Sequence, residues 1–487
     1  MPSKQKVKHH GQVYTPYYLV EIILDFGGYN NKQILRKHII DNSCGNGAFL
    51  CEIVRRYCYE YLKYSSDILT LKDDLQLYIH GIEIQKQEYE QCISNLNNIV
   101  KQFNIENVIW DIKNADTLTI SEYNLKMDYV FGNPPYVRVH NLDGNYKLVK
   151  QYQFAQQGMT DLFIVFFEIG FKMLSKFGKM CLITPSSWLN SNAGQKLRQY
   201  IYDKKNMSGV IDLQHFQAFS ATTYSLISRF DNNQIHEEFD YYTFNSYKKE
   251  IYFQEKLSIG SIKFDKQFYI SKYSDLQLLE KIRTNKIIKK YVQVKNGFAT
   301  LNDKIFIGDF DFTDGTIDVL KASTGVWSRI IFPYDNRGKA LPLDKFKNNK
   351  KAYEYMILHK KALSKNKDVT DDKYWYLYGR TQAIKDVFNK KYAINTIIKD
   401  MESIRLEEVA AGKGIYSGLY ILTQENYDTI KQLIYSEEFI NYIRLLKNYK
   451  SGGYYTYSSK DLEMFLNYKL AEQYGQSKIF TSNKSLF

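Results

Sequence analysis

Short apolar runs alternate with segments of helical periodicity through the first half of the chain. Residues 37–41 form an apolar run of strand length, residues 42–47 form a glycine-containing turn, and residues 48–64 carry apolar side chains at helical spacing. The pattern repeats with a strand at 76–84 and a helix at 85–103. The same alternation predicts a later helix at 161–177 and further strands at 107–116, 127–132, 179–185, 208–213 and 222–230. Strands that alternate with helices predict an α/β domain, in which helices cover both faces of a mostly parallel sheet.

Polar residues stand at the ends of four of these predicted strands. They are Asp41 with its glycine-containing turn, Glu83, Asp116 and the tetrapeptide Asn133–Tyr136. The carboxyl ends of parallel strands share one edge of a sheet, and ligands bind there. An acid at the end of the second strand can hold the hydroxyls of a ribose, although Glu83 and Asp116 are equally suited to cap the elements that follow them. The four features together predict a ligand site at this edge.

The tetrapeptide Asn133–Tyr136 reads NPPY and is the most specific of the four features. The chain has only 7 prolines in 487 residues, and two of them are adjacent here, directly after a predicted buried strand. Adjacent prolines remove two N–H donors and stiffen the backbone, which is unfavourable inside a central strand but holds a rigid loop at its end. The loop presents the amide of Asn133, carbonyl groups and the ring of Tyr136.

In this order, the motifs resemble those of S-adenosylmethionine-dependent DNA adenine-N6 methyltransferases of the TaqI-like class, the methylases of type II restriction-modification systems. GQVYTP at 11–16 is similar to the opening motif of that class, DNSCGNG at 41–47 to its glycine loop, and NPPY to its catalytic motif. The resemblance implies a Rossmann-like methyltransferase domain with a mostly parallel, seven-stranded sheet. It also implies cofactor contacts from Thr15, Asp41, Cys44, Gly45, Gly47, Glu83, Asp116 and Pro135.

The same resemblance makes Asn133, Pro134, Pro135 and Tyr136 the reaction centre. The exocyclic amine of adenine is a poor nucleophile, because its lone pair is delocalised into the ring. The side-chain oxygen of Asn133 and the carbonyl of Pro134 can accept hydrogen bonds from that amine and direct its lone pair at the methyl group, so that positioning carries the catalysis. The amine is inaccessible inside a duplex, so the base must be flipped out, and Tyr136 is expected to stack on it.

Residues 216–230 resemble the segment that carries a second aromatic side chain against the target base. Phe219 is our assignment for this role, and Phe216 and Tyr224 remain open alternatives. The plain structural alternative is a core aromatic residue beside a strand.

The second half of the chain is the more basic one. Residues 1–230 carry 25 Lys and Arg against 21 Asp and Glu, and residues 231–487 carry 41 against 32. Basic side chains interleaved with tyrosines suit a surface that faces DNA, and segments of this half resemble the target-recognition domain of the same class. We therefore divide the chain into a methyltransferase catalytic domain at 1–235 and a DNA target-recognition domain at 236–487. DNA contacts are assigned to Arg337, Arg380 and Lys450, against the alternative of a solvated basic surface.

The cysteines and the apolar runs argue against a disulfide-rich, a metal-binding, a membrane-spanning or a secreted protein. Five cysteines do not form a disulfide framework in a chain of this length, which favours a reducing cytoplasm. Cys44, Cys51 and Cys58 are expected on one buried helix face, without the His or Cys-x-x-Cys partners of a metal site. No stretch has the length of a membrane span, and the basic start lacks the apolar run of a signal peptide, so we expect it to be a flexible arm.

Four other functions fit part of the pattern. A methyltransferase of the same fold could act on RNA or on a protein glutamine amide, and the glutamine enzymes share the NPPY loop. A bifunctional restriction enzyme would need a nuclease domain, for which we expect no room before the first motif at Gly11. A non-catalytic specificity subunit would need neither the catalytic loop nor the acids. We therefore expect a monomer on double-stranded DNA, acting as the protective arm of a restriction-modification system beside a separately encoded endonuclease.

Overall fold

The structure, a computed structural model, describes residues 14–139, 146–158, 160–219, 223–284, 289–364 and 374–475. The chain forms two compact units, Met1–Leu276 and Gln277–Phe487. Their division falls inside helix α9, Tyr273–Thr284, and not after residue 235, where the change in composition placed it. Gly11 to Val13 of the first motif and the basic start lie outside the described residues.

A nine-stranded sheet with the order β3-β2-β1-β4-β5-β7-β6-β8-β9 forms the centre of the first unit. Strands β1 to β5 pair in parallel, whereas β7 is antiparallel to both β5 and β6. The strands are β1 Ile39–Asp41, β2 Ile79–Glu83, β3 Asp111–Asn114, β4 Met127–Gly132, β5 Leu174–Pro185, β6 Met207–Asp212, β7 Ser225–Asp231, β8 Glu238–Asn245 and β9 Glu250–Ser258. A short hairpin, β10 Lys263–Phe264 and β11 Gln267–Phe268, follows them.

The sheet has nine strands and not the seven that the resemblance implies, and β8 and β9 account for the difference. β8 pairs in parallel with β6, and β9 pairs antiparallel with β8 at the edge of the sheet. Nearly all side chains of β9 are exposed or half-buried, because an edge strand contributes little to a core. Its polar sequence therefore resembles the second half of the chain in composition, which is why the predicted boundary at residue 235 is too early.

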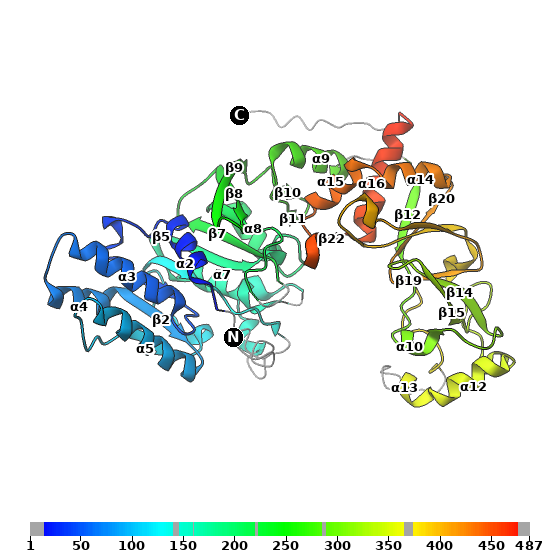
Figure 1. The fold of residues 1–487 in the computed structure, drawn as a ribbon, viewed down its shortest axis with the longest axis horizontal. Helices are drawn as coiled ribbons and strands as arrows, with labels where there is room; N and C mark the ends of the chain where they lie inside the picture. Colours follow the sequence, from blue (N-terminus) through cyan, green and yellow to red (C-terminus); the bar gives the residue numbers. More distant parts are fainter. Residues whose placement is uncertain are drawn as a thin grey trace. The chain divides into compact units, whose positions relative to one another are not determined.

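Helices cover the sheet on both faces. The helices are α2 Tyr17–Phe26, α3 Ala48–Leu62, α4 Ile68–Tyr78, α5 Lys86–Lys101, α6 Tyr146–Val149, α7 Leu162–Met173 and α8 Gln195–Lys204. Helices α3 and α5 lie side by side next to β2 (Figure 1). Short 3₁₀ turns stand at η1 Lys32–Ile34, η2 Thr117–Thr119, η4 Gln153–Ala155 and η5 Ser186–Leu189.

Several element boundaries differ from the predicted ones, and two of the differences lie where a helix meets a strand. The apolar run at 76–84 begins inside α4, so that its strand starts only at Ile79. The helix predicted at 161–177 ends at Met173, where β5 begins. In both places a buried helix runs directly into a buried strand, and apolar periodicity alone does not locate such a junction.

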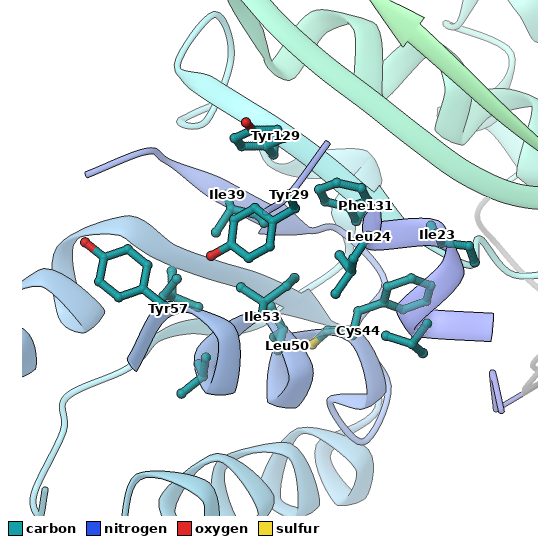
Figure 2. Packing of buried hydrophobic residues seen from close by; sticks show 14 of the residues in the cluster. Ile23, Leu24, Tyr29, Ile39, Cys44, Leu50, Ile53, Tyr57, Tyr129 and Phe131 are labelled. Atoms are coloured by element: carbon teal, nitrogen blue, oxygen red, sulfur yellow. The ribbon is translucent and has the colours of Figure 1, made fainter. Parts of the chain in front are cut away.

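One face of the sheet packs against α2 and α3. Figure 2 shows Leu24 of α2 and Ile53 of α3 close to the ring of Tyr29, which is fully buried. The Tyr29 ring lies 5.4 Å from that of Tyr129 and 6.1 Å from that of Phe131, both edge-on. These two rings belong to β4, so this cluster fixes α2 and α3 over the strand that ends in the NPPY loop.

Helix α7 covers the opposite face and is apolar on nearly all sides. Gly170 allows the helix to approach closely, because a Cβ there would lie 2.4 Å from the sulfur of Met180 on β5. Phe167 and Phe171 place their rings 5.9 Å and 5.2 Å from Phe230 of β7. β4 and the second half of β5, residues 180–185, are buried on both faces and have the near-continuous apolar sequence expected of central strands.

The described residues of the second unit form three small sheets, ordered β12-β20-β16-β18, β13-β15-β14-β19 and β17-β22-β21. Its strands are β12 Val292–Asn296, β13 Ile307–Gly308, β14 Thr316–Lys321, β15 Val326–Ile331, β16 Lys391–Ile394, β17 Ile397–Ile398, β18 Leu406–Val409, β19 Gly414–Tyr416, β20 Leu419–Thr423, β21 Tyr449–Lys450 and β22 Tyr454–Thr456. Its helices are α10 Asp303–Phe306, α11 Leu343–Phe346, α12 Lys350–Leu358, α13 Lys360–Ser364, α14 Tyr427–Ile434, α15 Glu437–Leu445 and α16 Ser459–Gln473. None of the helices in the described parts of the chain combines the length and apolarity needed to cross a membrane.

Candidate functional site

Strands β1, β2, β3 and β4 are parallel neighbours, so their carboxyl ends share one edge of the sheet. Asp41 is the last residue of β1 and Glu83 the last residue of β2. Asp116 follows β3 after one intervening residue, and Asn133 follows β4 directly. The structure thus brings these four predicted site residues to a single edge.

The glycine loop between β1 and α3 closes against the end of β2. The amide of Gly45 donates a hydrogen bond to Glu83 Oε2 at 2.9 Å, and Gly45 has a φ of +53°. A Cβ on Gly45 would meet no atom within 4 Å, so the loop faces open space beside the Glu83 carboxylate. Gly47 has a φ of +87° and faces the core instead, because a Cβ there would lie 2.8 Å from the sulfur of Cys92. Room for a ligand therefore lies on the Gly45 side of the loop.

Glu83 is buried and its carboxylate is held by backbone amides. It accepts from Gly45 N and, through Oε1, from Gln85 N at 2.7 Å. Burial raises the pKa of Glu83, while these amide donors oppose the rise. Gln85 is the N-cap residue of α5, and no side chain of the described residues caps this helix, so Glu83 holds the turn before α5 and does not take the capping role that the sequence left open. Its carboxylate nevertheless lies against the open side of the glycine loop.

Asp41 is enclosed more completely. It is 1% exposed and accepts from Ser43 N through Oδ1 at 3.0 Å. Burial raises the pKa of Asp41 to about 7, against the lowering effect of the Ser43 amide, and the charge of Glu83 adds to the rise. Gly132, which the sequence did not single out, leaves space for the Asp41 carboxyl group, because a Cβ on Gly132 would lie 2.8 Å from Asp41 Oδ1. The glycine before Asn133 therefore lets β4 approach the carboxyl group of Asp41.

Replacing Asp41 by asparagine should stabilise the protein more at high pH than at low pH. In the folded chain Asp41 keeps its proton up to about pH 7, whereas an unfolded carboxyl releases it near its ordinary value of 3.8. Between these two pKa values the folded state holds a proton on Asp41 that the unfolded state has released. The stabilisation that this protonated carboxyl group gives to the folded state is therefore lost as pH rises through about 7. We expect the urea midpoint of Asp41→Asn, relative to that of the parent, to rise between about pH 5 and pH 8.

The matched control for this titration is Asp67→Asn. Hydrogen bonds from Thr70 and Leu69 lower the pKa of Asp67, so its titration lies below the pH range of the measurement. Its effect on the urea midpoint should therefore be the same at both ends of the range. An Asp41→Asn effect that is equally independent of pH would contradict the protonated, buried Asp41.

The NPPY loop contacts both the glycine loop and the first motif. Asn133 Nδ2 donates to Thr15 Oγ1 at 3.2 Å, and Ser43 Oγ donates to the Asn133 carbonyl at 3.5 Å. Thr15 is 8% exposed, and Pro134 is buried as well. Three motifs that are far apart in the sequence, represented by Thr15, Ser43 and Asn133, therefore meet at the end of β4.

Tyr136 lies among aromatic side chains at the same edge. Its hydroxyl donates to the Ile183 carbonyl at 3.4 Å, and its ring lies 6.3 Å from Phe163 and 5.8 Å from Phe219, edge-on in both cases. Phe216 instead packs 5.1 Å from Phe244. Tyr224 accepts from Gln217 Nε2 at 3.3 Å and lies 6.1 Å from His215. Of the three candidate aromatics, Phe219 is the one whose ring contacts Tyr136 in the described residues.

Two predicted cofactor residues have additional local roles. Asp116 caps η2 by accepting from Leu118 N at 3.0 Å, as the sequence allowed. Cys44 lies in the glycine loop and not on α3, so the prediction of one helix face for Cys44, Cys51 and Cys58 is wrong. The helix begins only at Ala48, because the positive φ of Gly47 interrupts it. Cys44 contributes its backbone to the loop and turns its thiol to Cys92 in the core.

The three basic residues assigned to DNA lie on separate elements of the second unit. Arg337 is exposed in the turn at 335–339, where its amide donates to Asp335 Oδ1 at 2.9 Å. Arg380 is exposed beside Ala299, and Lys450 is exposed at the end of β21. No contact in the described residues joins them into one cluster. Nor is there, in those residues, a group of three His, Cys, Asp or Glu side chains arranged to hold a metal ion.

Tyr14 makes a further contact that was not predicted from the sequence. Its hydroxyl donates to Glu88 Oε1 at 2.8 Å, which anchors the residue before Thr15 to the first turn of α5. The only sequence signal was the position of Tyr14 inside GQVYTP, the opening motif.

Residues 51–219 match the family model of the Eco57I restriction-modification methylase. The matched range includes Glu83, Asp116, the NPPY loop and Phe219. The predicted resemblance to the methylases of restriction-modification systems is thereby confirmed for this part of the chain.

Curated relatives and solved structures agree with this match. The type II methyltransferase M.BstVI of Geobacillus stearothermophilus is 25% identical over 419 residues, which cover 75% of this chain and 74% of the relative. RM.Eco57I of Escherichia coli, a type II restriction enzyme and methyltransferase, is 23% identical over 56% of this chain and only 33% of its own length. The type IIL restriction-modification enzyme MmeI, solved in complex with DNA, has a TM-score of 0.63 at 13% identity and covers 91% of this chain and 63% of MmeI. At that identity MmeI supports the α/β methyltransferase fold alone, and its coverage extends into the second unit.

Proposed function

Residues 51–219 match the Eco57I restriction-modification methylase model, and from this match we propose that the chain transfers a methyl group from S-adenosylmethionine to the N6 amine of an adenine in duplex DNA. The observation that carries the proposal is the meeting of the NPPY loop, the glycine loop and Thr15 at the end of β4. A nucleophile held by Asn133 would lie next to the open side of the glycine loop. The alternative substrates, RNA and a protein glutamine amide, have no observation of their own in their favour.

The residues at the strand ends fit the cofactor. The open space before Gly45 leaves the loop accessible to a nucleoside, and Glu83 places a carboxylate beside it for the ribose hydroxyls. Asp116, at the end of the neighbouring strand, is proposed to accept from the amine of the cofactor's adenine ring. The backbone of Cys44 and Gly47 shapes the loop, and Pro135 is proposed to contact the methionine portion. When bound, S-adenosylmethionine supplies a methyl group on a positively charged sulfur.

The catalytic contribution of the chain is positional. The Asn133 amide nitrogen is engaged with Thr15, so the other branch of the amide, Oδ1, is the one to accept from the target amine. The Pro134 carbonyl is a second acceptor on the same rigid loop, and neither proline adds an N–H that would compete. Two acceptors on one N–H₂ group favour a pyramidal nitrogen, whose lone pair is then directed at the methyl group. As the N–C bond forms, the bond between the methyl carbon and sulfur would break and leave a neutral thioether. The amine would then release one proton to water, and a strong general base is not required.

The aromatic residues are proposed to hold the flipped base. Tyr136 and Phe219 lie 5.8 Å apart edge-on, so a purine must displace one ring in order to stack between them. The hydroxyl of Tyr136 is bonded to Ile183 on β5, which keeps Tyr136 in place. Phe219 is therefore proposed as the ring that moves.

The second unit is proposed to supply most of the DNA affinity. Residues 277–487 carry 35 Lys and Arg against 24 Asp and Glu, whereas residues 1–276 are nearly balanced, with 31 against 29. The unit boundary thus separates the charge more sharply than the predicted boundary at residue 235. Binding to the phosphate backbone follows such an excess and weakens with salt. Arg337, Arg380 and Lys450 remain proposed contacts, and protection of DNA beside a separate endonuclease is the proposed setting.

The direct test offers three acceptors to the purified protein with tritiated S-adenosylmethionine. They are plasmid DNA from cells without DNA methyltransferases, an RNA transcript of that plasmid, and an extract of the cells' proteins. We expect label only in the DNA, and only in N6-methyldeoxyadenosine after digestion to nucleosides. Label in RNA or protein, or label in N4-methylcytosine, would overturn the proposed substrate.

Glu83→Ala should weaken cofactor binding. Losing a charged hydrogen-bond acceptor costs roughly 1.5–3 kcal/mol, so we expect the dissociation constant of S-adenosylhomocysteine in calorimetry to rise by about tenfold or more. The control is Glu90→Ala, which removes an exposed carboxylate from the next helix and should leave affinity unchanged. The 2′-deoxy form of the ligand should show a smaller loss, because one of its ribose hydroxyls is already absent. An equal loss for both ligands would show that Glu83 supports the loop and does not bind the ribose.

A further inference from the structure

We propose that Thr15 is a positioning residue for Asn133: its hydroxyl holds the Asn133 amide in the orientation in which Oδ1 meets the target amine. The inference rests on the proposed function and assigns to Thr15 a role beyond the cofactor contact that the resemblance implies. Its basis is the hydrogen bond from Asn133 Nδ2 to Thr15 Oγ1, 3.2 Å long, between residues 118 positions apart in the chain.

An asparagine amide has a donor end and an acceptor end of nearly the same shape. Only one orientation of the Asn133 amide places Oδ1 toward the target amine. A hydrogen bond from Nδ2 holds the side chain in that orientation, because turning the amide away would break the bond in a site from which water is largely excluded. The Thr15 hydroxyl supplies the acceptor for this bond, and Thr15 is 8% exposed.

The backbone on both sides of the contact is restrained. Thr15 and Asn133 each precede a proline, Pro16 and Pro134, and a residue before proline is confined to extended conformations. Pro16 begins α2 by accepting from Leu19 N at 2.9 Å. Neither partner can therefore move away by a simple rotation of its backbone.

A second anchor holds the Thr15 side of the contact. The neighbouring Tyr14 donates to Glu88 Oε1 at 2.8 Å on α5. Adjacent residues thus connect the end of β4, through Thr15, with the helix that follows β2, through Tyr14. These two hydrogen bonds hold both residues of the segment, so contacts within the chain set the position of the Thr15 hydroxyl.

The test compares Thr15→Val with Thr15→Ser at saturating S-adenosylmethionine. Valine keeps the shape of threonine and removes the acceptor, whereas serine keeps the acceptor. We expect Thr15→Val to lower the single-turnover rate of methyl transfer to plasmid DNA about tenfold or more, and Thr15→Ser to restore most of it. Calorimetry with S-adenosylhomocysteine and anisotropy with labelled DNA should show Thr15→Val affinities within about threefold of the parent.

Two controls separate positioning from loss of structure. Tyr17→Phe removes a hydroxyl at the start of α2 that bonds to Glu52, away from the NPPY loop, and should leave the rate unchanged. In an Asn133→Ala background, Thr15→Val should lower the residual rate by less than twofold, because residues that act as a unit are not additive.

The outcomes distinguish this inference from the proposed function. If the parent protein does not methylate DNA, the proposed function fails and the inference falls with it. If the parent is active, an unchanged rate for Thr15→Val overturns the role of Thr15 alone. So does a lower cofactor affinity with an unchanged saturated rate, which would make Thr15 only a cofactor contact.

Discussion

Asn133→Ala is expected to lower single-turnover methyl transfer by about 10²–10³-fold, the scale found when one preorganised hydrogen-bonding group is removed from an active site. The reason is local, because the side-chain oxygen of Asn133 is the group proposed to orient the nucleophilic amine. DNA affinity comes mainly from phosphate contacts elsewhere, so it should stay within a few-fold of that of the parent. Rates with labelled cofactor and affinities by fluorescence anisotropy measure the two quantities separately. A parallel loss of rate and of DNA affinity would contradict the assignment of Asn133 to chemistry.

Tyr136→Ala is expected to cause the second large loss, and for a different reason. Stacking of a base on an aromatic ring is worth about 1–3 kcal/mol, so losing the ring should weaken retention of the flipped adenine. Tyr136→Phe keeps the ring and gives up the bond from the hydroxyl to Ile183, and it should remain substantially active. A dead Tyr136→Phe variant would contradict the stacking role.

Mismatched DNA separates the two residues. An adenine opposite a mismatch has already lost part of its pairing energy, so it flips more easily. It should partly rescue Tyr136→Ala, whose defect lies in holding the flipped base. It should not rescue Asn133→Ala, whose defect lies in the reaction itself. Equal rescue of both variants would show that the division of roles within the NPPY loop is wrong.

The edge on which the site lies could be predicted from the sequence because parallel strands impose it. Asp41, Glu83 and Asn133 each stand where an apolar run ends, and parallel pairing then brings them together whatever the loops do. The turn at Gly45 and Gly47 could be predicted as well. Both residues have positive φ angles, which other residues seldom adopt, so the turn is marked by glycines in the sequence.

Contacts between distant segments could not be predicted in the same way. The hydrogen bond from Asn133 to Thr15 depends on how α2 lies over β4, and no local pattern records that arrangement. The steric need for Gly132 is hidden for the same reason, since it arises only once β4 lies against Asp41. Phe219 was preferred over Phe216 and Tyr224 from resemblance alone, and only the structure shows its ring against Tyr136.

The predicted domain boundary at residue 235 differs from the boundary between the two units because the composition and the fold of the chain change at different places. The chain becomes richer in tyrosine and charged residues near residue 236, but β8 and β9 still extend the sheet of the first unit. An edge strand such as β9 needs few buried side chains, so its sequence gives little sign of the sheet to which it belongs.

The central claim is that the Asn133 loop directs methylation to the N6 amine of adenine in DNA. The most direct measurement is sequencing with modified-base detection on genomic DNA from cells that express the parent or Asn133→Ala, in a strain without other DNA methyltransferases. The account predicts N6-methyladenine at one position of a single recurrent sequence with the parent, and unmodified DNA with the variant. Modified cytosine, no modification with the parent, or equal modification with both proteins would contradict it.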